Sequence, residues 1–199
     1  MKSTFFPFLL SACTLLFSSC NAPSSNDDTS RRVEALLKEM TLEEKIAQMN
    51  QVNYLGNEEA AREAVRAGAG SVLNPIAFAN VPLPDVKAVN ELQRIAVEET
   101  RLGIPVITGR DVIHGFRTVM PIPLGQAASF DPELVKKGAR VAAREARASG
   151  VHVTFAPMLD ISRDPRWGRI SESFGEDTYL TSVMGEAMVK GFQTDNLKD

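Results

Sequence analysis

The sequence predicts an α/β fold built on a parallel sheet, and three observations support this. From residue 71 onward, short apolar segments alternate with longer segments of helical periodicity. The helical segments stop at Gly68, Gly103 and Gly150, and charged residues gather after the apolar segments. Strands and helices that alternate in this way form parallel sheets with crossover helices. An open doubly wound sheet and a closed (β/α) barrel both fit, and both bind ligands at the carboxyl ends of their strands.

The expected elements follow from local patterns. Thr41 and Glu44 form a T-x-x-E capping box, which predicts that a helix begins at residue 42. Asp131 followed by Pro132 is a typical helix start. Apolar periodicity and glycine stops predict helices over 30–40, 41–49, 58–67, 85–102, 131–149 and 178–192, and strands over 71–76, 104–108 and 151–156.

The N-terminal residues predict export and membrane attachment. Lys2 precedes an apolar stretch, 5–17, that is shorter than the ~20 residues needed to span a bilayer, as in a signal peptide. Ser18-Ser19-Cys20 resembles the lipobox of bacterial lipoproteins. The hypothesis is a lipoprotein signal peptide over 1–19, a lipid anchor at Cys20 and a polar tether over 20–29, on a periplasmic or cell-surface lipoprotein. A plain secretory signal with an incidental cysteine is the alternative.

Several classes of function are disfavoured. A net charge of −3 provides no basic field for nucleic acid. The chain has no G-x-x-x-x-G-K-[ST], G-x-G-x-x-G, C-x-x-C or G-x-S-x-G motif, and its histidines are His114 and His152. Nucleotide cofactors, a structural zinc site and a serine nucleophile elbow are therefore disfavoured, and neither a cofactor nor a metal is predicted.

Charged side chains gather after two of the predicted strands. Arg110, Asp111 and His114 follow strand 104–108, and a second group follows strand 151–156: Asp160, Arg163, Asp164, Arg166 and Arg169. A carboxylate accepts hydrogen bonds from neighbouring hydroxyls, and a guanidinium donates a planar fork of them, so the combination suits a sugar. From spacing alone, Asp111 could equally cap a helix or pair with Arg110.

Four segments carry a resemblance to a known family. GRDVIHGFRTVMPIPLG, FAPMLDISRDPRWGR, SFGEDTYLTSVMGEAMVKGF and MTLEEKIAQMNQV resemble the N-terminal part of glycoside hydrolase family 3, in particular its periplasmic β-glucosidases. The resemblance covers about residues 30–199. It implies a partial (β/α)8 TIM-type barrel with about the first three β/α units, and retaining hydrolysis of terminal non-reducing β-D-glucosyl residues from a small oligosaccharide or β-glucoside.

The resemblance also implies roles for individual residues. Asp111, in the D-x-x-H-G motif, and Arg169, in WGR, match residues that hold sugar hydroxyls, and Arg117 and His114 belong to the same site. Arg110 stands where an apolar residue is commoner in this family. The family's nucleophile Asp and acid/base Glu are expected beyond residue 199, so the chain is predicted to be a fragment that lacks its nucleophile.

Other functions stay open. The chain could be a non-catalytic sugar-binding lipoprotein, a fragment without independent function, or part of a different barrel enzyme such as a phosphate-handling aldolase. The other residues singled out in the second loop have structural interpretations. Trp167 is expected to anchor the loop, and packing on a ring face of the substrate is the alternative. Arg163, Asp164 and Arg166 are expected to form an ion-paired scaffold, and Glu176 and Asp177 to cap the last helix.

Overall fold

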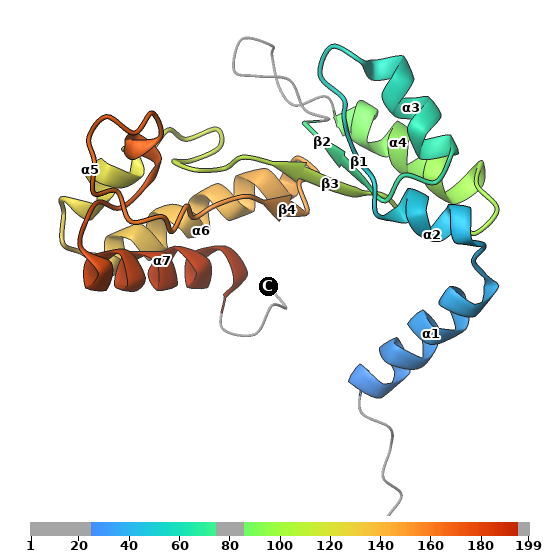
Figure 1. Cartoon of the computed structure of the whole chain (residues 1–199), viewed down its shortest axis with the longest axis horizontal. Coiled ribbons are helices and arrows are strands. Elements are labelled where there is room, and N and C mark those ends of the chain that lie inside the picture. The colour runs from blue at the N-terminus through green and yellow to red at the C-terminus, as the bar shows by residue number, and fades with distance from the viewer. Residues whose placement is uncertain (1–24, 75–85, 195–199) are drawn as a thin grey trace, which may run out of the picture. The chain divides into compact units, whose positions relative to one another are not determined.

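The computed structural model describes residues 25–74 and 86–194 (Figure 1). Residues up to Glu39 form one unit and those from Met40 form a second. In the first unit, helix α1 (Ser25–Glu39) begins five residues before the predicted start at Ser30, so the end of the predicted tether is helical. The predicted signal peptide and Cys20 lie outside the described residues. None of the described helices is long and apolar enough to cross a membrane.

The second unit contains a parallel sheet whose strands follow one another in chain order, β1-β2-β3-β4. The strands are β1 (Gln51–Asn53), β2 (Ser71–Leu73), β3 (Ile107–Arg110) and β4 (Val153–Thr154). A doubly wound sheet reverses its strand order at a switch point, whereas a (β/α) barrel adds each strand beside the one before it. The order seen here is that of a barrel. Strand β1 was not predicted from any sequence pattern.

The predicted strand over 104–108 is shifted in the structure, and the reason is a side chain. Gln93 donates to the Val106 carbonyl at 2.6 Å and accepts from the Val106 amide at 3.2 Å. Both backbone groups of Val106 are therefore occupied before the sheet begins. The ladder starts one residue later, where the Ile107 amide donates to the carbonyl of Gly70 at 2.9 Å.

The other two predicted strands are confirmed but shorter than expected. The first ends at Leu73, and the expected residues from 75 onward lie outside the described chain. The third consists of Val153 and Thr154 alone, because the next amide of the neighbouring segment, that of Val112, donates to the Thr154 hydroxyl instead of continuing the backbone ladder.

The helices begin where the sequence places their caps. Thr41 and Glu44 form both hydrogen bonds of the capping box, and Asp131 accepts from the Leu134 amide at 3.0 Å. Asp177 caps the last helix by accepting from the Leu180 amide, whereas Glu176 makes no capping bond. The helices of the second unit are α2 (Leu42–Gln48), α3 (Glu58–Arg66), α4 (Val86–Glu98), α5 (Pro123–Ala127), α6 (Pro132–Ala148) and α7 (Thr178–Gln193), with a 3-10 turn at Ile170–Glu172. The short helix α5 and the 3-10 turn were not predicted.

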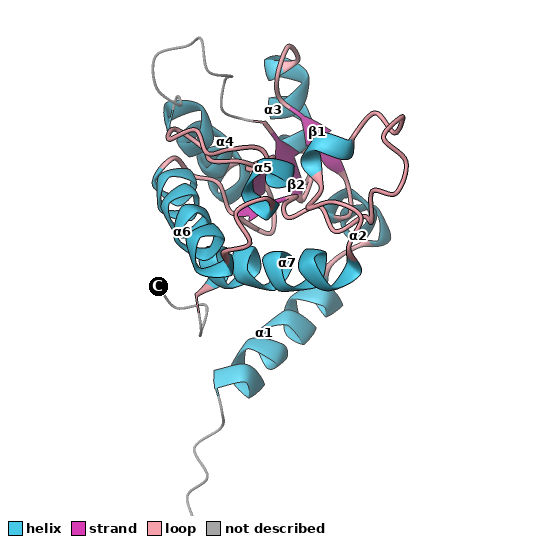
Figure 2. Ribbon diagram, turned by 90° about the vertical axis from the view of Figure 1, so that its left-hand side faces the viewer, coloured by secondary structure: helices cyan, strands magenta, loops and turns pink. Residues whose placement is uncertain are grey.

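Apolar side chains of the helices pack on the sheet and on each other. Helices α3 and α4 pack on β2 through a cluster that includes Val65, Val72 and Leu92. Helices α6 and α7 lie side by side (Figures 1 and 2) and share a cluster with Ala139 and Met184. A third cluster, which includes Val112, Ala142 and Val151, joins α6 to the segment after β3 and the segment before β4. The crossover helix between β3 and β4 is thus fixed on both sides.

Two helical glycines provide a matched test of this packing. A Cβ at Gly191 of α7 would lie 2.5 Å from the Lys136 carbonyl oxygen and 2.6 Å from the Ala139 Cβ, whereas a Cβ at Gly138 of α6 would meet nothing closer than 3.8 Å. We expect Gly191→Ala to lower the free energy of unfolding by about 2 kcal/mol, because overpacking outweighs the gain in helix propensity. Gly138→Ala should raise it by up to ~1 kcal/mol. Urea denaturation measures both, and equal effects of the two substitutions would contradict the close α6–α7 contact.

Candidate functional site

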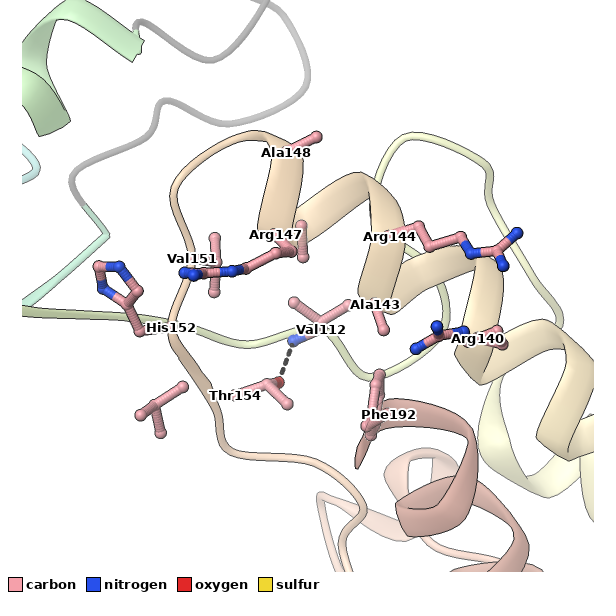
Figure 3. Close-up of a pocket in the computed structure, with 12 residues that line it drawn as sticks. Val112, Arg140, Ala143, Arg144, Arg147, Ala148, Val151, His152, Thr154 and Phe192 are labelled. Carbon is pink, nitrogen blue, oxygen red and sulfur yellow. Dashed lines mark hydrogen bonds between the residues drawn. The ribbon is translucent and has the colours of Figure 1, made fainter. Parts of the chain in front are cut away.

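The candidate site lies where the chain leaves β3 and β4. These strands pair in parallel, with Arg110 opposite Thr154, so their carboxyl ends meet at one edge of the sheet. The pairing continues one step further, because the Val112 amide donates to the Thr154 Oγ1 at 3.0 Å (Figure 3). The exposed carboxylate of Asp111 lies between these two contacts in the chain. No helix begins there, so the interpretation of Asp111 as a helix cap is wrong.

The loop after β3 is a closed turn. Gly115 and Val119 form an antiparallel bridge, and the Met120 amide donates to the His114 carbonyl at 2.8 Å. The side chains of His114 and Arg117 are exposed on this turn. At its tip, the amides of Arg117 and Thr118 donate to the carboxylate of Glu145 on α6. No sequence pattern had indicated Glu145.

Arg110 lies under this loop rather than in solvent. Its guanidinium is half-buried and lies 5.6 Å from the centre of the Phe116 ring. Burial lowers the pKa of Arg110, and the charge of Asp111 acts in the opposite direction. The charges of Asp111 and Arg110 therefore attract each other, although the guanidinium is half-buried.

The loop after β4 carries Arg169. Its guanidinium donates to both carboxylate oxygens of Glu172, at 3.0 and 2.7 Å. The pKa of Arg169 is raised first by these hydrogen bonds, and also by the charges of Glu172, Asp160 and Asp111. Asp111 and Arg169, which sequence reasoning assigned to one site, therefore lie close enough to interact electrostatically. Asp160 joins them, although no role had been predicted for it.

The charged part of this loop is braced internally, as expected for two of its three residues. Arg166 donates to Asp164 from its backbone amide at 3.0 Å and from its guanidinium at 2.5 to 3.1 Å. These bonds lower the pKa of Asp164. Arg163 is exposed and forms no ion pair with any described residue, so its predicted place in the scaffold is wrong.

The apolar anchor of this loop is Phe174 rather than Trp167. The Phe174 side chain is 2% exposed and packs in the cluster shared by α6 and α7, whereas Trp167 is only half-buried. Beside Phe174, the buried hydroxyls of Ser162 and Ser173 are hydrogen-bonded, and the Ser162 amide donates to the Gly175 carbonyl at 3.0 Å. These contacts close the loop at its base.

A cavity of about 490 Å³ lies between α6, β4 and the end of α7 (Figure 3). Three arginines of α6 line it together with His152, whose pKa is lowered by burial and then by the charge of Arg147. The His152 Nδ1 accepts from the Thr108 amide at 3.2 Å, which fits a neutral imidazole. None of the four predicted sugar-contact residues is among its lining residues. Within the described ranges, no group of three or more His, Cys, Asp or Glu side chains could hold a metal ion.

Comparison with known proteins decides the family. The family described as "Glycosyl hydrolase family 3 N terminal domain" matches residues 41–199. The chain belongs to glycosyl hydrolase family 3. The match confirms the resemblance seen in the sequence, and it starts at the Thr41 capping box rather than at residue 30.

Several family 3 proteins are similar to this chain over most of its length. A periplasmic β-glucosidase of Salmonella typhimurium is 43% identical over 87% of this chain, and a putative β-xylosidase of Formosa agariphila is 37% identical over 97%. A crystal structure of a β-glucosidase from Listeria innocua in complex with glucose superposes with a TM-score of 0.72 at 43% identity, over 83% of this chain. The chain spans 22%, 28% and 24% of these three proteins. The likeness confirms the barrel-type α/β fold.

The two arginine–carboxylate pairs of the second loop allow a paired test. Hydrogen bonds from Arg169 hold the pKa of Glu172 below its ordinary value, and Arg166 does the same for Asp164. Arg169→Gln should therefore raise the pKa of Glu172 and leave that of Asp164 unchanged, and Arg166→Gln should do the reverse. Carboxyl carbon NMR titration measures both. A Glu172 pKa that does not respond to Arg169→Gln would contradict the pairing.

Proposed function

We propose that this chain supplies the glucosyl-binding part of a retaining family 3 β-glucosidase. In this proposal Asp111 and Arg169 contact hydroxyls of the terminal non-reducing β-D-glucosyl unit. The observation that carries it is the parallel pairing of β3 with β4, because it brings the loops that carry Asp111 and Arg169 to the same edge of the sheet. The relatives that are named β-glucosidases support the substrate class.

The chemistry of the two groups suits a sugar. An ionised Asp111 has two acceptor oxygens for adjacent hydroxyls, and its exposure leaves them accessible to a ligand. Glu172 occupies the Nε and Nη2 donors of Arg169 and orients its guanidinium, so Nη1 is the proposed donor to a sugar hydroxyl and little side-chain freedom remains to be lost on binding. His114 and Arg117, exposed on the turn after β3, are proposed as further contacts.

The proposal assigns no catalytic carboxylate to the 199 residues. Retaining hydrolysis needs two carboxyl groups about 5 to 5.5 Å apart, one as nucleophile and one as acid and base. The resemblance gives the nucleophile Asp and the acid/base Glu to positions beyond residue 199. Asp111 and Asp160 are therefore proposed as sugar-facing and supporting groups, and the glucosyl unit binds without being cleaved.

Glucose binding tests this assignment. Structures of the Listeria innocua protein contain glucose and laminaribiose, so glucose is a suitable probe. Asp111→Asn and Arg169→Gln should each weaken glucose binding about tenfold or more, because each removes charge-assisted hydrogen bonds. Arg166→Gln is the control, since Arg166 is an exposed arginine of the same loop that pairs with Asp164 and has no proposed sugar contact. Isothermal titration calorimetry measures the affinities. The fluorescence of Trp167, the single tryptophan, is a second signal of binding because it lies in the same loop as Arg169.

Two results would contradict the proposal. Unchanged glucose affinity in both the Asp111 and Arg169 variants would remove these residues from the site. Release of nitrophenol from a nitrophenyl β-glucoside by the purified chain would show that the catalytic carboxylates are within it.

Export and lipid anchoring complete the proposal. Two relatives, from Salmonella typhimurium and Dickeya chrysanthemi, are named as periplasmic enzymes, which supports export of this chain to the cell envelope. The lipobox-like Ser18-Ser19-Cys20 supports a lipid anchor at Cys20.

Metabolic labelling tests the anchor. When the full chain is expressed in a bacterial host, it should incorporate labelled palmitate. Cys20→Ser should abolish labelling because it removes the acylated thiol, whereas Cys13→Ser, within the apolar stretch, should retain it. Labelling that survives Cys20→Ser would exclude Cys20 as the anchor.

A further inference from the structure

The carboxylate of Glu145 is the centre of a contact that joins helix α6 to the loop after β3. Its Oε2 accepts from the backbone amides of Arg117 and Thr118, each at 2.8 Å, and its Oε1 accepts from the Thr118 hydroxyl at 2.6 Å. The hydroxyl bond, then the two backbone bonds, lower the pKa of Glu145. Three donors thus converge on one carboxylate, which is charged at neutral pH.

The loop that Glu145 holds has a fixed internal shape. Gly115 has a φ of +99°, and a Cβ there would clash with the Thr118 carbonyl oxygen. The bridge between Gly115 and Val119 closes the turn and leaves Arg117 and Thr118 at its tip. The internal geometry of the turn is therefore fixed by its own contacts, and its orientation depends on the contacts that join it to the rest of the molecule.

Two kinds of contact join the loop after β3 to the rest of the molecule, and they constrain different parts of it. Phe116 packs against the apolar cluster between α6 and the sheet, and the Val112 amide is bonded to Thr154 at the start of the loop. These contacts hold the base of the loop against the apolar cluster. The carboxylate of Glu145 instead binds the backbone at the tip of the loop, and so sets the direction in which the Arg117 side chain projects from the backbone.

We propose that Glu145 is a positioning residue for sugar binding, which orients the Arg117 side chain by holding the loop tip against α6. This inference rests on the proposed function, because Arg117 is one of its proposed contacts. Helix α6 also connects β3 to β4, so the same helix that spaces the two strands orients a side chain above them. Glu145 acts through Arg117 and touches no sugar.

Substitutions at Glu145 separate this role from simple stability. Glu145→Ala removes all three acceptor contacts, whereas Glu145→Gln keeps a carbonyl oxygen for the two amides. Glu133→Ala is the matched control, since Glu133 is an exposed carboxylate on the same helix. Hydrogen exchange over residues 114–120 and tryptic cleavage after Arg117 report on the contact without requiring any ligand.

We expect Glu145→Ala to speed exchange over 114–120 by about tenfold or more, and to weaken glucose affinity to the same degree as Arg117→Gln. The Glu145→Gln variant should keep most of the protection from exchange and most of the glucose affinity, and Glu133→Ala should change neither quantity. Adding Arg117→Gln to Glu145→Ala should cause little further loss, because the two residues act in one contact. A purely structural role would give additive losses.

The outcomes are distinct from those that bear on the proposed function. If the unaltered chain does not bind glucose, both the proposed function and this role fail. If it binds glucose and loses that binding with Asp111→Asn, but Glu145→Ala binds as tightly as the unaltered chain, only the role of Glu145 is overturned. Unchanged exchange over 114–120 in Glu145→Ala would overturn the contact itself.

Discussion

The parallel pairing of β3 with β4 is the constraint on which the candidate site depends. It rests on two residue pairs, Gly109 with Val153 and Arg110 with Thr154, and on side-chain and backbone bonds just outside them. The His152 amide donates to the Thr108 carbonyl before the ladder, and Thr154 accepts from the next loop after it. Because parallel strands end at the same edge, this short pairing places two loops that are distant in sequence side by side.

The crossover helix makes so short a pairing sufficient. Helix α6 packs against α7 at the close contact of Gly191 with Ala139, and its Ala142 packs with Val112 and Val151, which flank β3 and β4. Its N-terminus is fixed by the Asp131 cap, and its carboxylate at Glu145 binds the first loop. The same helix therefore sets the spacing of the strands and the orientation of the loop above them. Packing, rather than the length of the strand ladder, fixes the geometry of the site.

Patterns that act over three or four residues predicted the structure well, and contacts between distant residues were missed. The caps at Thr41, Asp131 and Asp177 are local, and each is confirmed. Strand β1 has polar residues at both ends and gave no apolar run to detect. The start of β3 depends on Gln93, and the first loop depends on Glu145, both of which act across the fold. By contrast, the Arg169–Glu172 pair has a spacing of three residues and could have been recognised from the sequence.

In the proposed site, the loops after β3 and β4 form one sugar-binding surface with Asp111 on one side and Arg169 on the other. A crystal structure of the chain grown with glucose tests it most directly. Glucose hydroxyls should lie within hydrogen-bond distance of both the Asp111 carboxylate and the Arg169 guanidinium, with the Arg110–Thr154 pairing intact. Glucose bound elsewhere, or loops whose Asp111 and Arg169 face apart, would contradict it.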